Sequence, residues 1–294
     1  MIDLHIHTKY SPDSENEPIE ILKNAKKNKL DYISITDHND VSFYENEYIE
    51  YKKHYNGVII PGCEINSYIG NQTIEVLAYN IDVTKIKPFL NKYFTFEKRK
   101  EEYEKSMEIL FLKAEKIGLV VNKDIINIKQ GIIYWATVFL NEVCSHEENK
   151  SKFMDDAWGN INIFYRQYIS NPNSEWYIEV IENTPRVDEA IKNIHDADGL
   201  VFIAHPFEYP IKNVELFLDE LVKAGIDGIE CYHISAFDEK NDYLLKYAKN
   251  KNLFISGGSD YHGLVSKDKY RMVGDSTMKL EIPTEIIKDW NSKI

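Results

Sequence analysis

Cysteine and long apolar runs are both scarce in this chain of 294 residues. Its three cysteines, Cys63, Cys144 and Cys231, lie far apart without paired spacing, which argues against a disulfide framework or a cysteine zinc knuckle and fits a reducing compartment. No apolar run approaches the roughly 18 residues of a membrane span, and the opening residues resemble a buried strand rather than a leader peptide. These absences predict a cytoplasmic protein without membrane contacts.

Positive charge is also in short supply. Lys and Arg total 35 against 48 Asp and Glu, a formal net charge of −13, and only four of the basic residues are arginines. This balance disfavours broad electrostatic binding to duplex DNA. A small phosphorylated substrate is compatible with it, because bound cations reverse the local potential of a pocket whatever the net charge of the chain.

Short apolar strands followed by helices are abundant. With 43% hydrophobic residues, the chain can bury a sizeable core. Strands are expected at 3–7, 32–36, 58–60, 73–79, 200–204, 228–233 and 253–256. Strand and helix alternating about seven times predict an α/β fold with a parallel barrel or sheet.

Residues 82–184 interrupt this alternation. Apolar side chains recur at helical spacing in the highly charged stretch 97–117, and Gly118 is expected to end that helix. Further helices are expected at 131–144 and 161–169. The pattern predicts a helical insertion at 82–184 within a domain built from 1–81 and 185–294.

The opening strand carries two histidines on one face. Side chains alternate along a strand, so His5 and His7 point the same way, roughly 6–7 Å apart, with Leu4 and Ile6 on the other side. Asp13 follows six residues after His7. Imidazole and carboxylate groups are ligands that borderline divalent metals favour. Alone, this motif is equally compatible with a half-exposed strand that happens to carry two histidines.

Further potential ligands follow the later strands. The complete set is His5, His7, Asp13, His38, Glu64, His205, Asp260 and His262. Active sites of (β/α) barrels are built at the carboxyl ends of the strands, where these residues are expected. Buried charges at that end would be costly unless they were paired or bound to metal. Together they predict a metal site.

The segments that carry these residues resemble the ordered motifs of the PHP (polymerase and histidinol phosphatase) superfamily. The motifs are Asp3-Leu4-His5-Ile6-His7-Thr8, Thr36-Asp37-His38-Asn39, Gly62-Cys63-Glu64, Ala204-His205-Pro206 and Gly258-Ser259-Asp260-Tyr261-His262-Gly263. The resemblance covers 1–80 and about 186–275. The segment 228–233 and the insertion look most like the branch that hydrolyses nucleoside 3′,5′-bisphosphates and oligonucleotide 5′ ends.

The resemblance implies a distorted (β/α)7 barrel, capped by the helical insertion and holding two or three divalent metals, usually Mn, Fe or Zn. By motif, the first metal would take His5, His7, Glu64 and Asp260, with Glu64 bridging to the second. The second would add His205 and the residue at position 75. The third would take Asp13, His38 and His262.

Two departures from the family pattern affect these expectations. Relatives commonly carry histidine where this chain has Glu75. A carboxylate can replace imidazole on these metals, so Glu75 is a candidate ligand. The alternative is that Glu75 is a strand residue that faces outward. The Arg-Pro-His element usual in the insertion is absent, and 131–137 fills its expected place. Within that stretch Tyr134 and Trp135 fit helix packing better than a pocket lining.

Candidates for substrate contact are few. Arg166, Arg186 and Arg271 are potential phosphate clamps, although arginines are more often surface residues. His233, just past a strand, is expected to contact substrate or to protonate the leaving group, with a surface histidine as the alternative.

The resulting hypothesis is a metal-dependent phosphoesterase in which a metal-bridging hydroxide attacks a small phosphorylated substrate, nucleotide or short single-stranded nucleic acid, with Asp260 and His233 as catalytic residues. Two alternatives stay open. One is a phosphatase of the histidinol-phosphate type on the same centre, and the other is a module that holds metal without catalysis.

Overall fold

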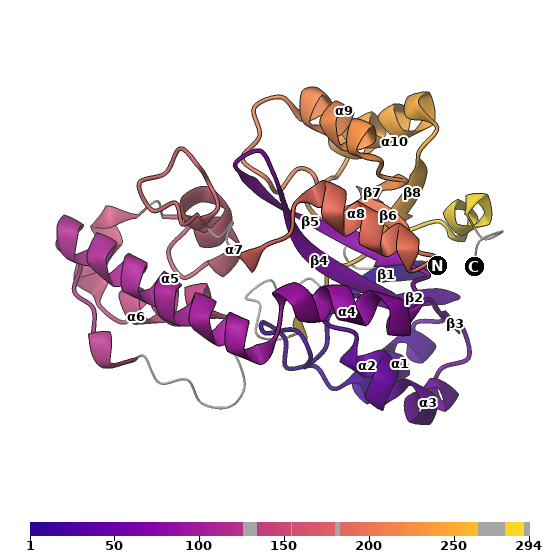
Figure 1. Cartoon of the computed structure of the whole chain (residues 1–294), viewed down its shortest axis with the longest axis horizontal. Helices are drawn as coiled ribbons and strands as arrows, with labels where there is room; N and C mark the ends of the chain where they lie inside the picture. The colour runs from indigo at the N-terminus through magenta and orange to yellow at the C-terminus, as the bar shows by residue number, and fades with distance from the viewer. Residues whose placement is uncertain (126–133, 154, 180–182, 264–279, 291–294) are drawn as a thin grey trace.

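The computed structural model describes residues 1–125, 134–153, 155–179, 183–263 and 280–290, and within them eight strands form two sheets (Figure 1). The first sheet is parallel and contains, in order, β1 (Ile2–Ile6), β2 (Tyr32–Ile35) and β3 (Val58–Ile59). The second contains, in order, β4 (Gly62–Ile69), β5 (Gln72–Tyr79), β6 (Leu200–Ile203), β7 (Gly228–Tyr232) and β8 (Phe254–Gly257).

The two sheets meet at the end that carries the predicted ligands. One parallel bridge joins Ile6 to Tyr261 and another joins His38 to Glu64. Strands β6, β7 and β8 run parallel, whereas β5 is antiparallel to both of its neighbours. The predicted mixed α/β fold is confirmed. A closed seven-stranded barrel is not confirmed, because the strands of the described residues divide into two sheets.

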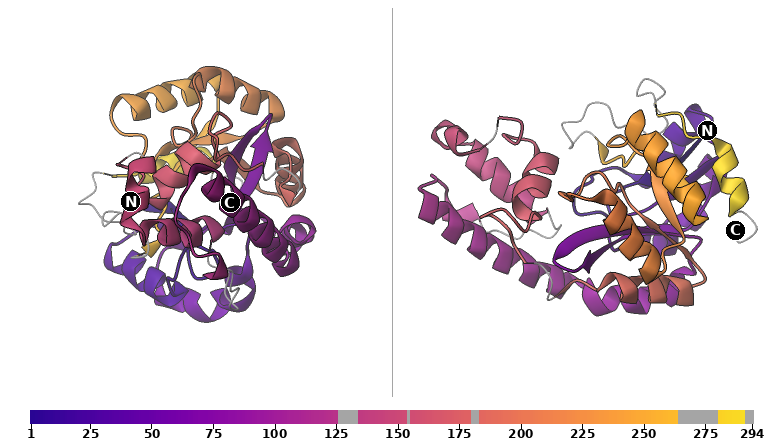
Figure 2. Two further views of the ribbon diagram at one scale, coloured as in Figure 1. Left: turned by 90° about the vertical axis from the view of Figure 1, so that its left-hand side faces the viewer. Right: turned by 90° about the horizontal axis from the view of Figure 1, so that it is seen from above.

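In the described part of the chain, one set of α-helices accompanies the sheets and another set stands to one side of them (Figures 1 and 2). The former are α1 (Pro18–Lys27), α2 (Ser42–Asn46), α3 (Tyr48–Tyr51), α4 (Val83–Tyr93), α8 (Val187–Asp196), α9 (Val214–Ala224) and α10 (Glu239–Lys251). The latter are α5 (Phe96–Ile117), α6 (Trp135–Cys144) and α7 (Ile161–Phe164).

Helix α5 confirms the helix expected at 97–117. The side chain of Thr95 caps it by accepting from the backbone N–H of Lys98, and Gly118 ends it with φ of 70°. A residue with positive φ after the last turn favours glycine, which has no Cβ to clash. The segment between β2 and β3 forms two short α-helices, α2 and α3, followed by a 3-10 turn at Lys52–His54.

Apolar side chains gather in three separate cores. The largest lies between the sheets and their helices, and a smaller one, which includes Leu4, Leu77 and Trp290, fills the space between the sheets. The third belongs to the inserted segment, with all its buried members between Tyr103 and Ile178. A separate core fits a segment that folds around its own apolar residues; the bounds 82–184 stay a prediction.

Within the described residues, no helix combines the length and the apolar character that crossing a membrane requires.

Candidate metal centre

Strand β1 brings His5 and His7 together as predicted, with their ring centroids 5.1 Å apart and both side chains fully buried. Its apolar residues behave differently from expectation. Leu4 packs in the core between the sheets and Ile6 in the core under the helices, because the pairing of β1 with β2 shifts between Asp3 and Ile6. Such irregularities re-aim side chains next to functional sites.

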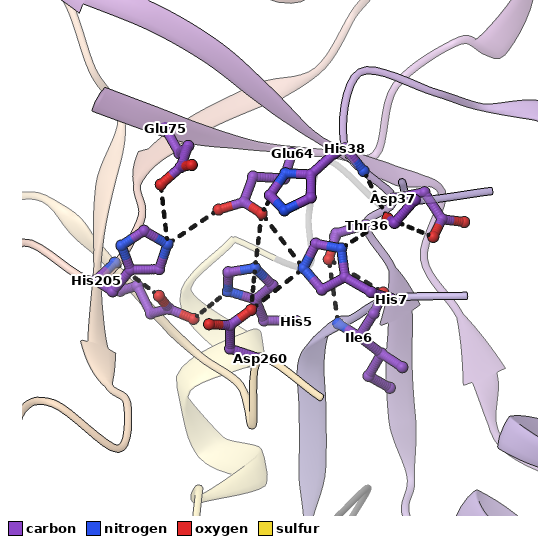
Figure 3. Close-up of polar contacts among 12 residues, drawn as sticks. His5, Ile6, His7, Thr36, Asp37, His38, Glu64, Glu75, His205 and Asp260 are labelled. Atoms are coloured by element: carbon purple, nitrogen blue, oxygen red, sulfur yellow. Dashed lines mark hydrogen bonds and ion pairs between the residues drawn. The ribbon is translucent and has the colours of Figure 1, made fainter. Parts of the chain in front are cut away.

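The first group of candidate ligands surrounds the ring nitrogens of β1. The Nε2 atom of His5 lies 3.2 Å from a Glu64 carboxylate oxygen and 3.4 Å from Oδ1 of Asp260. The Nε2 atom of His7 lies 3.3 and 3.2 Å from the same two oxygens. Four side chains, from β1 and the residue after it, from β4 and from the loop after β8, therefore point at one small volume (Figure 3).

Two further groups flank the first. His38 and His262 each place Nε2 3.3 Å from Oδ2 of Asp13. On the other side, Nε2 of His205 lies 3.1 Å from Glu64 and 3.5 Å from Glu75. Figure 3 shows Glu64 between His205 and the histidines of the other groups. All nine predicted ligands thus fall into overlapping groups whose ligand atoms lie within 4.8 Å of one another.

Glu64 and Glu75 reach the centre from the β4–β5 hairpin. The sequence predicted that Glu64 follows the end of a strand. In the structure it lies near the start of β4. Glu75 sits in the middle of β5, opposite Asn66, and its side chain turns inward toward His205. An inward orientation is the one that a ligand requires.

The chemistry of the donor set fits divalent cations. The ring nitrogens of His5 and His7 that face the carboxylates, together with Oε2 of Glu64 and Nδ1 of His38, are buried and have no hydrogen-bond partner among the described residues. Leaving buried polar atoms unpaired costs about 1–3 kcal/mol each. Imidazoles and carboxylates that converge without sharing hydrogen bonds are arranged as ligands around cations, and this mixed set suits Mn, Fe or Zn.

A second layer of buried groups holds the candidate ligands in place. Glu230 accepts from Nδ1 of His5 at 2.9 Å and from the backbone N–H of His205 at 2.8 Å, which ties two groups together. The hydroxyl of Ser11 lies 2.9 Å from Nδ1 of His7 and donates to Asp37. Such partners orient a metal-binding imidazole and select its tautomer. Sequence reasoning missed Glu230, whose only signal is an acidic residue inside a buried strand.

The loop that carries Asp260 is held against β1. Asp3 accepts hydrogen bonds from the backbone N–H and the hydroxyl of Ser259, at 2.9 and 2.7 Å. A Cβ built on Gly258 would lie 2.2 Å from Cβ of His5, so only glycine permits this approach. Burial raises the pKa of Asp3 to about 6, against the opposing effect of its bonds to Ser259.

Neighbouring charges in the centre shift the pKa values of its histidines and carboxylates. Burial alone lowers the pKa of His38, but Asp13 and Glu64 outweigh it and raise the pKa to about 10. Burial also opposes the charge of His205, yet its hydrogen bond to Glu64 and the charges of Glu208 and Glu75 raise its pKa to about 9. Burial raises the pKa of Glu64, whereas the surrounding histidines hold it well below its usual range.

These pKa shifts predict that metal affinity rises with pH, whereas the stability of the metal-free fold falls with pH. Metal must displace protons from His38 and His205, so the apparent affinity for Mn²⁺ should rise from pH 6 to pH 9, with proton release detectable by calorimetry in buffers of different ionisation enthalpy. Raised histidine pKa values stabilise the metal-free fold below the unfolded value of about 6.5, and this contribution is lost as pH rises through 9 and 10.

Thermal unfolding of chelator-treated protein should therefore show its midpoint falling between pH 7 and pH 9.5, and added Mn²⁺ should reverse the fall. A Mn²⁺ affinity that is independent of pH would contradict this account of the centre.

The remaining predicted residues separate into two sets. His233 is fully buried, with Nε2 3.5 Å from Oδ2 of Asp260, so it belongs to the centre and is not a surface histidine. Arg186 is exposed and pairs with Asp188, and the structure does not bring it to the ligands. Arg271 lies outside the described residues.

Arg166 reaches the centre from the inserted segment. Its Nη2 atom donates to Glu75 at 2.5 Å, and its Nε atom lies 3.6 Å from Glu208. The guanidinium sits between the rings of Tyr165 and Tyr209, 5.5 and 5.1 Å from their centroids. A cation therefore stands beside the ligands although the Arg-Pro-His element is absent.

A mixed α/β fold with overlapping groups of buried and half-buried histidines and carboxylates defines a candidate metal-binding protein. The chain belongs to the PHP domain family, which matches residues 3–275.

Relatives of known name span nearly the whole chain. A 5′-3′ exoribonuclease of Haemophilus influenzae is 26% identical over 263 residues, covering 88% of this chain and 89% of the relative. The 5′-3′ exoribonuclease Rnm of Escherichia coli is 22% identical, covering 88% and 84%. A Bifidobacterium adolescentis protein of known crystal structure, described as a metal-dependent phosphoesterase by assignment, superposes with a TM-score of 0.71 at 20% identity. The match covers 99% of this chain and 96% of that protein. This last likeness supports the fold.

Proposed function

We propose that this protein is a metal-dependent phosphoesterase that hydrolyses nucleotides or the 5′ ends of short single-stranded oligonucleotides. The observation that carries the proposal is the sharing of the buried Glu64 carboxylate among histidines from three ligand groups. The relatives named exoribonucleases, each of which matches 88% of the chain, support a substrate of nucleic-acid type.

The proposed ligand allocation follows the three groups. One ion would be held by His5, His7, Glu64 and Asp260, a second by Glu64, Glu75 and His205, and a third by Asp13, His38 and His262. We also propose that the two sheets are parts of one distorted barrel, since one bridge joins the end of β1 to the segment after β8 and another joins the segment after β2 to β4. The insertion would cap this barrel, because Arg166 reaches Glu75 from there.

Two or three bound divalent ions would supply an activated water and would neutralise charge that develops on the phosphoryl group. The chain's own groups position the substrate and move protons. Arg166 has five N–H donors in a planar fork and would bind phosphoryl oxygens beside Glu75. His233 faces Asp260 at 3.5 Å and would donate a proton to the leaving oxygen.

The role of Arg166 leads to a prediction. Replacing Arg166 with methionine should lower kcat/KM about 100-fold, because it removes the fork that binds phosphoryl oxygens. Arg166→Lys should recover part of this loss, since it restores the charge without the fork. Arg186→Met serves as the matched control, because Arg186 is exposed and pairs only with Asp188 among the contacts described. Equal losses in the Arg166 and Arg186 variants would exclude Arg166 as a phosphate clamp.

Hydrolysis by Mn-loaded protein tests the proposed function directly. Phosphate or nucleotide release should be faster from adenosine 3′,5′-bisphosphate and from 5′-phosphorylated oligoribonucleotides than from L-histidinol phosphate. Faster release from L-histidinol phosphate would favour a histidinol-phosphate-type phosphatase. Full metal content with no release from a broad phosphoester panel would favour a module that only holds metal. Less than one metal per chain after metal-supplemented purification would contradict all three functions.

A further inference from the structure

A pocket opens beside the metal centre and extends to the inserted segment. His38 and Glu75 line it at one end, and Tyr134, Trp135 and Tyr165 line it at the other. The sequence predicted packing for Tyr134 and Trp135, and both do pack against the core of the insertion. The structure adds that they also face this pocket.

The far wall of the pocket is aromatic. The ring of Tyr134 lies 5.4 Å from that of Trp135 and 5.6 Å from that of Tyr165, the latter in an edge-to-face arrangement of 63°. The indole N–H of Trp135 donates to Glu102 at 3.3 Å, which anchors the ring by its polar edge. Rings fixed in this way offer π-faces to a planar ligand, and stacking on such faces binds any nucleobase.

The near wall carries polar atoms without partners. Oδ1 of Asn66 and Oγ1 of Thr73 are buried and have no hydrogen-bond partner in the part of the chain that the structure describes. Asn66 lies opposite Glu75 in the β4–β5 hairpin, and Thr73 precedes Glu75 by two residues, so strand alternation places all three on one face. Buried unpaired groups are costly, and a ligand whose edge bears donors and acceptors would offset that cost.

We propose that this pocket binds the nucleobase of the nucleotide whose phosphate reacts at the metal centre. This inference rests on the proposed phosphoesterase function and assigns the residues that select its substrate. A base combines a flat π-face for Tyr134, Trp135 and Tyr165 with a polar edge for Asn66 and Thr73. Arg166 directly follows Tyr165 and bonds to Glu75, so one short segment would hold both base and phosphate.

Binding of adenosine, which has no phosphate, tests the pocket separately from hydrolysis. Calorimetry should detect adenosine binding to the purified full chain and no binding of ribose. Tyr134→Ala should weaken adenosine binding roughly tenfold to hundredfold, since it removes a stacking face, whereas Tyr134→Phe should preserve it. Thr73→Val, which only replaces a hydroxyl with a methyl group, should weaken it by several-fold, about the effect of one hydrogen bond.

Tyr177→Ala is the matched control, because Tyr177 is an aromatic residue of the insertion that bonds to the backbone of Asn71 and does not line the pocket. Circular dichroism and thermal unfolding check that each variant folds. Absence of adenosine binding to the parent protein would overturn the inference. An equal loss in Tyr177→Ala would do so as well.

Kinetics separates this inference from the proposed function. Mn-loaded protein should release phosphate from AMP with kcat/KM at least about tenfold above that for ribose 5-phosphate, mainly through KM, and Tyr134→Ala should reduce this ratio toward one. Equal kcat/KM for both substrates in the parent protein would overturn the base pocket and leave the phosphoesterase standing. Adenosine binding without phosphate release from any phosphoester would support the pocket and overturn the proposed hydrolysis.

Discussion

Replacing Glu64 with glutamine is expected to lower kcat/KM at least about 1000-fold and to reduce the metal content by one ion or more. The Glu64 carboxylate is fully buried and lies within 3.3 Å of ring nitrogens of His5, His7, His38 and His205. A carboxylate in this place can serve two cations at once, whereas an amide offers one weaker oxygen and an N–H that repels them. Loss of metal assistance removes several kcal/mol of transition-state stabilisation.

Glu50→Gln provides the matched control for this substitution. Glu50 is exposed in α3, so the same loss of one carboxylate there should leave metal content and turnover unchanged. Elemental analysis after metal-supplemented purification and initial rates of phosphate release are the measurements. A Glu64→Gln protein that retains full metal content and normal turnover would show that the centre is organised around other residues.

Substitution of Asp260 is expected to be almost as damaging, with activity lost by about 1000-fold or more while the fold persists. Asp260 Oδ1 faces Nε2 of both His5 and His7, and Oδ2 faces His233, so one carboxylate joins the proposed metal ligands to the proposed proton donor. His7→Ala should abolish activity similarly, because it removes a ligand of the same group.

The backbone at Asp260 decides which variant is informative. Its φ is 52°, a left-handed conformation that asparagine tolerates and that costs alanine about 1 kcal/mol. Asp260→Asn therefore removes the charge without added backbone strain and should be compared with Asp260→Ala. Asp238 also has φ of 52° and is exposed at the start of α10, so Asp238→Ala reports what alanine costs at a positive φ outside the centre. Turnover retained in Asp260→Asn would refute its place in the centre.

Local patterns in the sequence identified most of the groups in this centre. His5 and His7 share a strand face because side chains alternate, and the polar residues after the apolar strands at 32–36 and 200–204 include His38 and His205. The family resemblance added the allocation of ligands and pointed to Glu75. The structure brings these residues together, because spacing within one strand or one short motif determines that part of the geometry. Their roles as metal ligands stay a prediction.

Contacts between distant segments were beyond this reasoning. Glu230 contacts His5 although the two residues lie 225 positions apart in the sequence. No local pattern around either residue predicts this contact. Arg166 lies 91 positions from Glu75, and its spacing within the insertion gave no reason to prefer it over Arg186. The antiparallel course of β5 also escaped prediction, because an apolar strand pattern does not specify the direction of its partner.

The sequence by itself determined most of the elements and the chemical groups that they carry, since apolar periodicity, caps and strand alternation act over a few residues. Strand β4 is an exception, because no strand was expected at 62–69. Only the tertiary structure decided that Glu64 lies among histidines from three groups of candidate ligands, that the guanidinium of Arg166 bonds to Glu75, and that a pocket with aromatic lining adjoins these candidate ligands. The physical reason is that packing of the sheets and the insertion sets these distances, and packing depends on contacts between residues far apart in the chain.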